Sequence, residues 1–252
     1  QAVICGKAKE KEFELICGYC RQYLIDHGGF VMKLKKLAAM MAAAAMVFSL
    51  AACGGKSNTV ESKSVENAAE ETMTVDKDKK ILMLCEVNGT YFTEPTRHGI
   101  VYKGGSNGEK AVLRGLADEK EFYQALLDIG AKAGDNLTAA DMKAGPDNGK
   151  SVDGDKLDVF VKWDGQDEIP FRDIIQCTED YTMDLRFGGN IESAKENNTG
   201  CVLCLDSCAT GIVSDAAWPT GTTQNDIAKF YGDKDVLPED GTQVTVIFRL
   251  AK

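Results

Sequence analysis

The sequence lacks an apolar run long enough to cross a membrane. Its longest such run, 37–50, is shorter than the roughly 20 residues that a membrane-spanning helix requires. Lys33, Lys35 and Lys36 precede the run, and a positive segment followed by a short apolar segment is typical of an export signal. The shortness of the run therefore favours export over insertion into the membrane, and the whole pattern predicts a signal peptide over 32–52.

The apolar run ends in a motif that marks an expected cleavage site. Leu50-Ala51-Ala52-Cys53 resembles the lipobox of bacterial lipoproteins, in which small residues precede a cysteine that is lipidated and becomes the mature N-terminus. We expect acyl chains on Cys53, where each buried CH₂ adds about 0.8 kcal/mol of membrane affinity. The expected location is the cell membrane, where this lipid anchor holds the protein on the extracytoplasmic face.

No methionine precedes Met32. We expect residues 1–31 to be read-through of an untranslated leader. The mature protein would then lack four residues that otherwise suggest metal chemistry, namely Cys5, Cys17, Cys20 and His27.

Basic residues are in the minority. The chain has 29 Lys and Arg against 39 Asp and Glu, and residues 53–252 keep 22 against 35, a net charge of −13. A surface this acidic repels phosphate backbones, which argues against nucleic-acid binding. It also repels anionic lipid, so the membrane contact is expected to rest on the anchor at Cys53.

Large apolar residues are scarce between 57 and 78, where Glu, Ser, Lys, Thr and Asn predominate. Such a segment cannot bury enough apolar surface to offset the entropy lost on ordering. We therefore expect a disordered tether over 53–78 and a globular domain over 79–252.

The domain alternates short apolar segments with turn signals. Asn88-Gly89 and the glycine-rich 104–108 predict the turns of two hairpins. Asp118 opens a capping sequence and Gly130 supplies a stop, so one amphipathic helix is expected between them. Its apolar face would consist of Phe122, Ala125, Leu126 and Ile129. Further strands are expected at 157–163, 183–187, 201–205, 211–213 and 244–250. The pattern predicts an α+β fold, a mainly antiparallel sheet with one well-defined helix packed on it.

Several of these segments carry a family resemblance. The segments are 125–130, 157–165, 183–190, 200–215 and 238–248. Together they resemble the YdjY-type domain, a family of exported bacterial proteins of unestablished function, some of which carry a ferredoxin-like name. The resemblance covers most of 79–252 and rests on glycine and apolar positions, so it implies a fold and no catalytic residue.

The cysteines give the clearest chemical signal. Cys201, Cys204 and Cys208 form a C-x₂-C-x₃-C pattern, and Cys177 precedes them. Thiolates at such spacing bind zinc or iron–sulfur clusters, although the run lacks the further cysteine and trailing proline of a four-iron ferredoxin. Side chains alternate along a strand, so residues 201 and 204 are expected on opposite faces unless the chain turns between them.

Export favours a different fate for the same cysteines. Paired thiols outside the cytoplasm tend to become disulfides, and the set Cys177, Cys201, Cys204 and Cys208 could form two bridges. Cys85 would remain as a small buried hydrophobe. We expect no cofactor, and the alternative is zinc or an iron–sulfur cluster on these four cysteines.

His98 is the one histidine after residue 52, in a polar connection between the two expected hairpins. Such a residue serves as a base, a metal ligand or a pH-sensitive contact, or is simply hydrogen-bonded to the backbone. A Cys–His nucleophile pairing with Cys204 or Cys208 is possible by residue type, but spacing alone does not show that these residues meet. No residue is assigned as catalytic.

Three classes of function remain. The first is a lipoprotein that binds a small ligand or a protein partner, and we favour it because it requires the fewest contacts. The second is a metal-binding or electron-transfer lipoprotein that uses the cysteines. The third is an enzyme that depends on a thiol or on His98.

Overall fold

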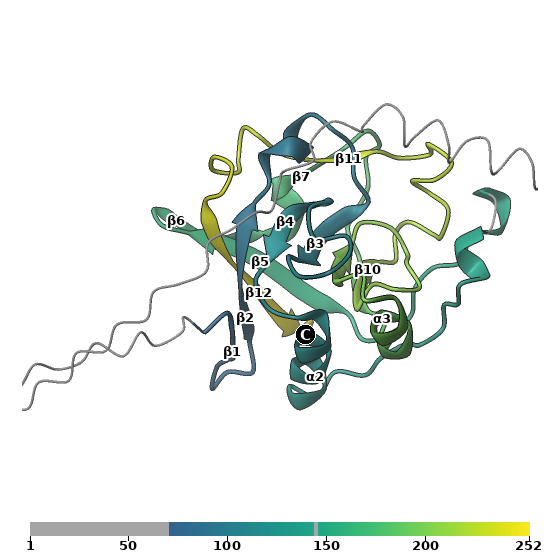
Figure 1. The fold of residues 1–252 in the computed structure, drawn as a ribbon, viewed down its shortest axis with the longest axis horizontal. Coiled ribbons are helices and arrows are strands. Elements are labelled where there is room, and N and C mark those ends of the chain that lie inside the picture. The colour runs from purple at the N-terminus through teal and green to yellow at the C-terminus, as the bar shows by residue number, and fades with distance from the viewer. Residues whose placement is uncertain (1–70, 144–145) are drawn as a thin grey trace, which may run out of the picture. The chain divides into compact units, whose positions relative to one another are not determined.

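The computed structural model describes residues 71–143 and 146–252 (Figure 1). The expected leader, the signal peptide, Cys53 and most of the tether lie outside these ranges. Among the described residues, no helix is both long and apolar enough to cross a bilayer.

Twelve strands and two α-helices form the described part of the chain. The strands are β1 (Met73–Val75), β2 (Ile81–Val87), β3 (His98–Tyr102), β4 (Ala111–Gly115), β5 (Leu157–Trp163), β6 (Gln166–Pro170), β7 (Ile175–Cys177), β8 (Leu185–Phe187), β9 (Cys201–Cys204), β10 (Val213–Asp215), β11 (Phe230–Gly232) and β12 (Gln243–Leu250). The α-helices are α2 (Glu119–Asp128) and α3 (Ile191–Asn197), and the short 3₁₀ helices are η1 (Gly89–Phe92), η2 (Asp141–Lys143), η3 (Pro146–Asn148) and η4 (Phe171–Ile174).

Ten of the strands form one mixed sheet. Its order is β6-β5-β12-β2-β4-β3-β9-β10-β8, with β1 paired to β2, while β7 and β11 form a separate pair. The pairs β3–β4 and β9–β10 are parallel and the others are antiparallel. The α+β class is confirmed, but the expected mainly antiparallel sheet is only partly right.

The central strands follow the pattern of the sequence. β12 lies between β2 and β5 and pairs with both in antiparallel register. Leu157, Val159 and Val161 of β5 are all buried, as strict alternation predicts. Asp164-Gly165 then turns the chain into β6.

α2 is the expected amphipathic helix. The Asp118 side chain caps it by accepting a hydrogen bond from the Lys120 backbone N–H, and Gly130 follows its end at φ +97°. All four residues of the predicted apolar face are buried, and the Phe122 ring lies 4.6 Å from that of Phe248 on β12. The helix is therefore packed against the sheet.

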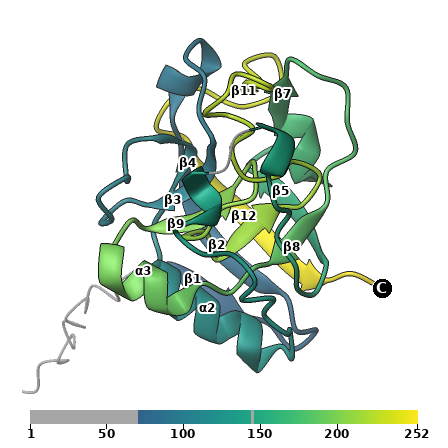
Figure 2. The same cartoon turned by 90° about the vertical axis from the view of Figure 1, so that its right-hand side faces the viewer.

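A second helix was not expected. α3 contacts α2, and Figure 2 shows the two side by side. Asn190 and Asn198 at its two ends both have left-handed backbone conformations. Its few apolar residues give no helical period that sequence reasoning could detect.

Three local expectations are wrong. Asn88 caps the 3₁₀ helix η1, so Asn88-Gly89 is not a hairpin turn. The connection 103–110 joins two parallel strands, so it is not a hairpin turn either. β1 lies inside the segment expected to be tether, because Met73 and Val75 pair with β2, and the fold therefore begins before residue 79.

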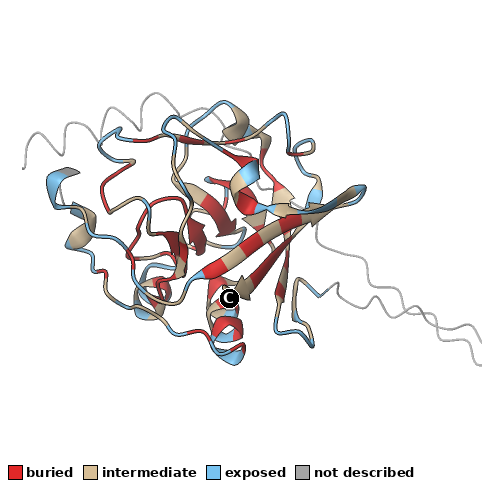
Figure 3. Ribbon diagram, turned by 180° about the vertical axis from the view of Figure 1, so that it is seen from behind, coloured by how far each residue is buried: buried red, intermediate tan, exposed pale blue. Residues whose placement is uncertain are grey.

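Buried residues form one main core and two small clusters (Figure 3). The first small cluster, here called the cysteine cluster, consists of Val101, Ala111, Cys201, Cys204 and Cys208, with Met142 packed against it. The next residues of β9, Val202 and Leu203, belong to the main core. β9 thus separates the cysteine cluster from the main core.

Candidate metal centre

An irregularity in β9 places Cys201 and Cys204 on the same side of the sheet. Cys201 pairs with Val101 and Leu203 pairs with Ile100, so two steps along β9 match one step along β3. Val202 is the extra residue of a β-bulge, and a bulge breaks the alternation of side chains. The expectation that the two cysteines face opposite ways is therefore wrong.

β3 carries a matching irregularity that brings in His98. His98 pairs with Cys204, and Gly99 is the extra residue before Ile100. A Cβ atom on Gly99 would lie 2.6 Å from the Leu203 Cδ2 atom, so only glycine fits here without displacing the core. The two bulges place His98 opposite both cysteines.

The three side chains form one group of possible ligand atoms. The His98 Nδ1 atom lies 3.7 Å from the Cys201 Sγ atom and 3.9 Å from the Cys204 Sγ atom. All three ligand atoms lie within 4.8 Å of one another, with both cysteines buried and His98 half-buried. A tetrahedral ion with the usual zinc bond lengths holds its nitrogen and sulfur ligands about 3.6 Å apart. The arrangement thus suits a single ion.

Cys208 is the third cysteine of the C-x₂-C-x₃-C pattern. Its Sγ atom lies 3.2 Å from the Thr210 Oγ1 atom, and it belongs to the same buried cluster as Cys201 and Cys204. It is outside the group of three possible ligands, so the structure places it beside the group and not in it.

The three sulfurs shift one another's pKa values in opposite directions. The hydrogen bond from Cys204 lowers the pKa of Cys201 against the opposing effect of burial, and His98 lowers it further. The pKa of Cys208 is lowered mainly by the same thiol and also by Arg97. The pKa of Cys204 is raised, because the neighbouring Cys201 and Cys208 sulfurs favour its protonated form and because it is buried. Thiolate is the form that binds metal.

A partly buried cation, Arg97, stands beside the cysteines. The Arg97 Nη2 atom donates to the Asp206 Oδ1 atom at 2.6 Å, and the Asp206 side chain is fully buried. Burial alone would lower the pKa of Arg97, but Asp206 and the nearby Cys208 and Cys204 raise it overall. The cation compensates part of the negative charge that thiolates bring into the interior. Sequence reasoning missed Arg97, which only its position next to His98 could have suggested.

The loop between β3 and β4 covers one side of Cys201. Asn107 Nδ2 donates to the Cys201 Sγ atom across 3.9 Å. Gly105 packs so closely on Gly200 that an added Cβ atom would lie 2.6 Å from the Gly200 Cα atom. The glycine-rich segment 104–108 therefore serves as a cover for the cysteines.

The other cysteines are not part of the site. Cys177 ends β7, in the separate two-stranded sheet, and packs against the main core. Cys85 is buried in β2 as a small hydrophobe, as expected. All five cysteines of the described ranges are free thiols, so the structure contains neither of the two expected bridges. Cys177 is not close enough to serve as the fourth ligand.

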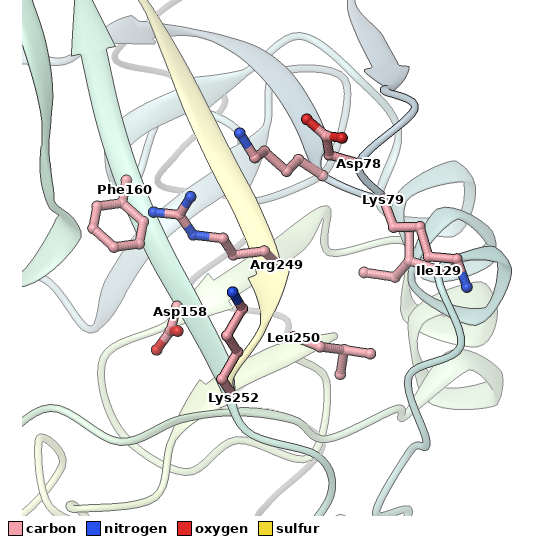
Figure 4. A pocket seen from close by; sticks show the side chains of 9 residues that line it. Asp78, Lys79, Ile129, Asp158, Phe160, Arg249, Leu250 and Lys252 are labelled. Atoms are coloured by element: carbon pink, nitrogen blue, oxygen red, sulfur yellow. The ribbon is translucent and has the colours of Figure 1, made fainter.

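A separate surface pocket of about 740 Å³ is far from this chemistry (Figure 4). None of the cysteines and neither His98 nor Arg97 lines it. Arg249 in its wall already stacks over Phe160 at 3.9 Å and reaches Glu168. The pocket is lined by both acidic residues (Asp78 and Asp158) and lysines, so its charge favours neither an anionic nor a cationic ligand.

The fold and the site define a class: an α+β domain with a buried Cys–His group on one side of a mixed sheet. The model of the YdjY domain family matches residues 73–249, and the chain belongs to that family. It is similar to "Uncharacterized protein YdjY" of Escherichia coli (strain K12), with 39% identity over 212 residues, which cover 82% of this chain and 91% of that protein. No solved structure matches.

Proposed function

We propose that this protein binds a single thiophilic metal ion through His98, Cys201 and Cys204. The observation that carries the proposal is that three ligand atoms from two strands lie within 4.8 Å of one another. Cys208 is the candidate for a fourth ligand, which would close the site. Of the three functional classes, the geometry favours the metal-binding one.

A single ion fits these residues better than an iron–sulfur cluster does. A four-iron cluster takes four thiolates, with its own iron and sulfide atoms standing between them. Of the five cysteines in the described ranges, only Cys201, Cys204 and Cys208 lie together, and Cys177 is in another sheet. The closely spaced nitrogen and sulfur atoms leave room for one ion.

The same Cys–His contact could serve a thiol nucleophile, but burial opposes that use. The side chains of Cys201 and Cys204 are both fully buried, so a bulky substrate has no direct path to either sulfur. Reactive cysteines are partly exposed. A metal ion needs a much smaller opening, and the half-buried His98 provides the exposed side of the site.

We also propose that a lipid at Cys53 holds the domain on the extracytoplasmic face of the cell membrane. The positive segment, the short apolar run and Leu50-Ala51-Ala52-Cys53 support this location. Metal binding would then also protect the cysteines, because thiolates bound to a metal do not form disulfides in an oxidising compartment.

Titration of metal-free protein with Co²⁺ and Zn²⁺ under anaerobic conditions tests the metal site. We expect one ion per chain and intense sulfur-to-cobalt absorption, which Cys201→Ser and Cys204→Ser each reduce. Loss of a ligand should weaken binding by more than the 10- to 100-fold typical of outer-shell changes. Cys177→Ser is the matched control and should bind like the unaltered protein. No stoichiometric binding of any thiophilic ion, or equal loss in the control, would refute the proposal.

A further inference from the structure

A thioether lies at the edge of the cysteine cluster. Met142 of η2 is half-buried and packs against this cluster. Its Sδ atom accepts a hydrogen bond from the Ala209 backbone N–H at 3.2 Å, which places it beside the residue that follows Cys208. The structure therefore places a thioether at the edge of the cysteine cluster, where Met142 also packs against the neighbouring cluster of Leu137, Val152 and Ala209.

Hard ligands are missing from the same group. Among the described residues, the ligand group at the cysteines includes no carboxylate. The buried carboxylate two residues along the chain from both Cys204 and Cys208, Asp206, is already engaged by Arg97 and by the Thr223 hydroxyl. Carboxylates suit magnesium, calcium and manganese, whereas thiolates and thioethers favour soft ions.

We infer that the site takes monovalent copper, Cu⁺, and that the Met142 thioether determines this selectivity. The inference rests on the proposed metal site and adds to it the identity of the ion. Zinc would be held by the thiolates and His98 alone, because a thioether is a weak ligand for it. Copper binding should therefore depend on Met142, and zinc binding should not.

A purely structural role for Met142 makes a different prediction. Leucine has nearly the same volume and apolar character, so Met142→Leu preserves packing and removes the sulfur. Met183→Leu is the matched control, because Met183 is also partly buried but packs against the main core. A packing role would make the two variants alike in metal affinity.

The experiment is an anaerobic competition between the protein and a chromogenic Cu⁺ chelator, run beside a Zn²⁺ titration. Met142→Leu should weaken Cu⁺ binding by about 10-fold while changing Zn²⁺ affinity by less than about 2-fold. Met183→Leu should leave both affinities unchanged.

The outcomes separate the two proposals. If the protein binds no Zn²⁺, Co²⁺ or Cu⁺, the metal site itself is refuted. If it binds Zn²⁺ but no Cu⁺, or if Met142→Leu leaves Cu⁺ affinity unchanged or lowers both affinities equally, the inference about copper is overturned and the metal site stands.

Discussion

The Cys201 Sγ atom lies 3.7 Å from the His98 Nδ1 atom, although 103 residues separate them in the chain. Two bulges in adjacent strands produce this contact, with Val202 as the extra residue in β9 and Gly99 as the extra residue in β3. A regular antiparallel pairing would direct Cys201 and Cys204 to opposite faces. The candidate site is therefore a property of the irregular register.

Gly99→Ala should disrupt both the fold and the site. The added methyl would overlap Leu203 and crowd Phe171, and overpacking of this kind destabilises by about 1–3 kcal/mol. Urea unfolding and Co²⁺ titration measure the two effects. Gly165→Ala, at a turn with open space around it and φ +78°, should cost about 1 kcal/mol and leave metal affinity intact. Equal metal affinity in the two variants would contradict the role of the bulge.

Asp206→Ala should be among the most destabilising single changes. It leaves the Arg97 cation beside the cysteines without its buried partner, and breaking such a pair costs about 3–5 kcal/mol. Glu86→Ala removes the partly exposed ion pair with Lys103 and should cost less than about 1 kcal/mol. Denaturant unfolding compares them, and similar losses would show that the Arg97–Asp206 pair contributes no more than a surface pair.

Asp215 should make the domain less stable as the pH rises from about 4 to 6. Burial raises its pKa from 3.8 to about 6, against the lowering effect of backbone hydrogen bonds from Asp184 and Ala217. The folded state thus binds an extra proton in that window and loses this advantage above it, at a cost of about 3 kcal/mol.

Asp215→Asn should remove this pH dependence. The Asp215 Oδ2 atom is buried without a hydrogen-bond partner among the described residues, so a neutral amide relieves the cost of the charge. We expect a gain of about 1–3 kcal/mol at pH 8 and little change at pH 4. Unfolding at both pH values measures it, with the exposed Asp167→Asn as control. A loss of stability at pH 8 would contradict this reading.

Cys53→Ser should release the protein from the membrane. If the lipid at this cysteine is the anchor, radiolabelled palmitate enters the unaltered protein and not the variant, which then leaves the membrane fraction. The control variant Cys85→Ser keeps Cys53, the proposed site of acylation, and should still be labelled with palmitate. Labelling of the Cys53 variant would show that the acyl chain is elsewhere.

Local periodicity was enough to predict the elements that have a regular pattern. The helix from Asp118 to Gly130 and the strand β5 follow directly from spacing, because each buries one regular face. β12 was also predicted, although three consecutive residues of it, Val246, Ile247 and Phe248, are buried. The direction of pairing between β3 and β4 did not follow, because a glycine-rich connection suits a hairpin as well as a short crossover. Family membership was predicted from glycine and apolar positions and is confirmed.

The site was harder to predict than the fold. The cysteine spacing identified Cys201, Cys204 and Cys208 as candidates, but alternation argued against chelation because bulges leave no reliable trace in one sequence. Cys177 was grouped with them only by residue type, and the fold places it in another sheet. Met142 and Arg97 join the site through tertiary contacts that sequence spacing does not encode.

X-ray absorption at the zinc edge of the stoichiometric complex tests the metal centre most directly. The account predicts sulfur neighbours at about 2.3 Å and a nitrogen neighbour at about 2.0 Å, with the sulfur signal reduced in Cys204→Ser. A first shell of oxygen and nitrogen alone, or a spectrum that Cys204→Ser leaves unchanged, would contradict it.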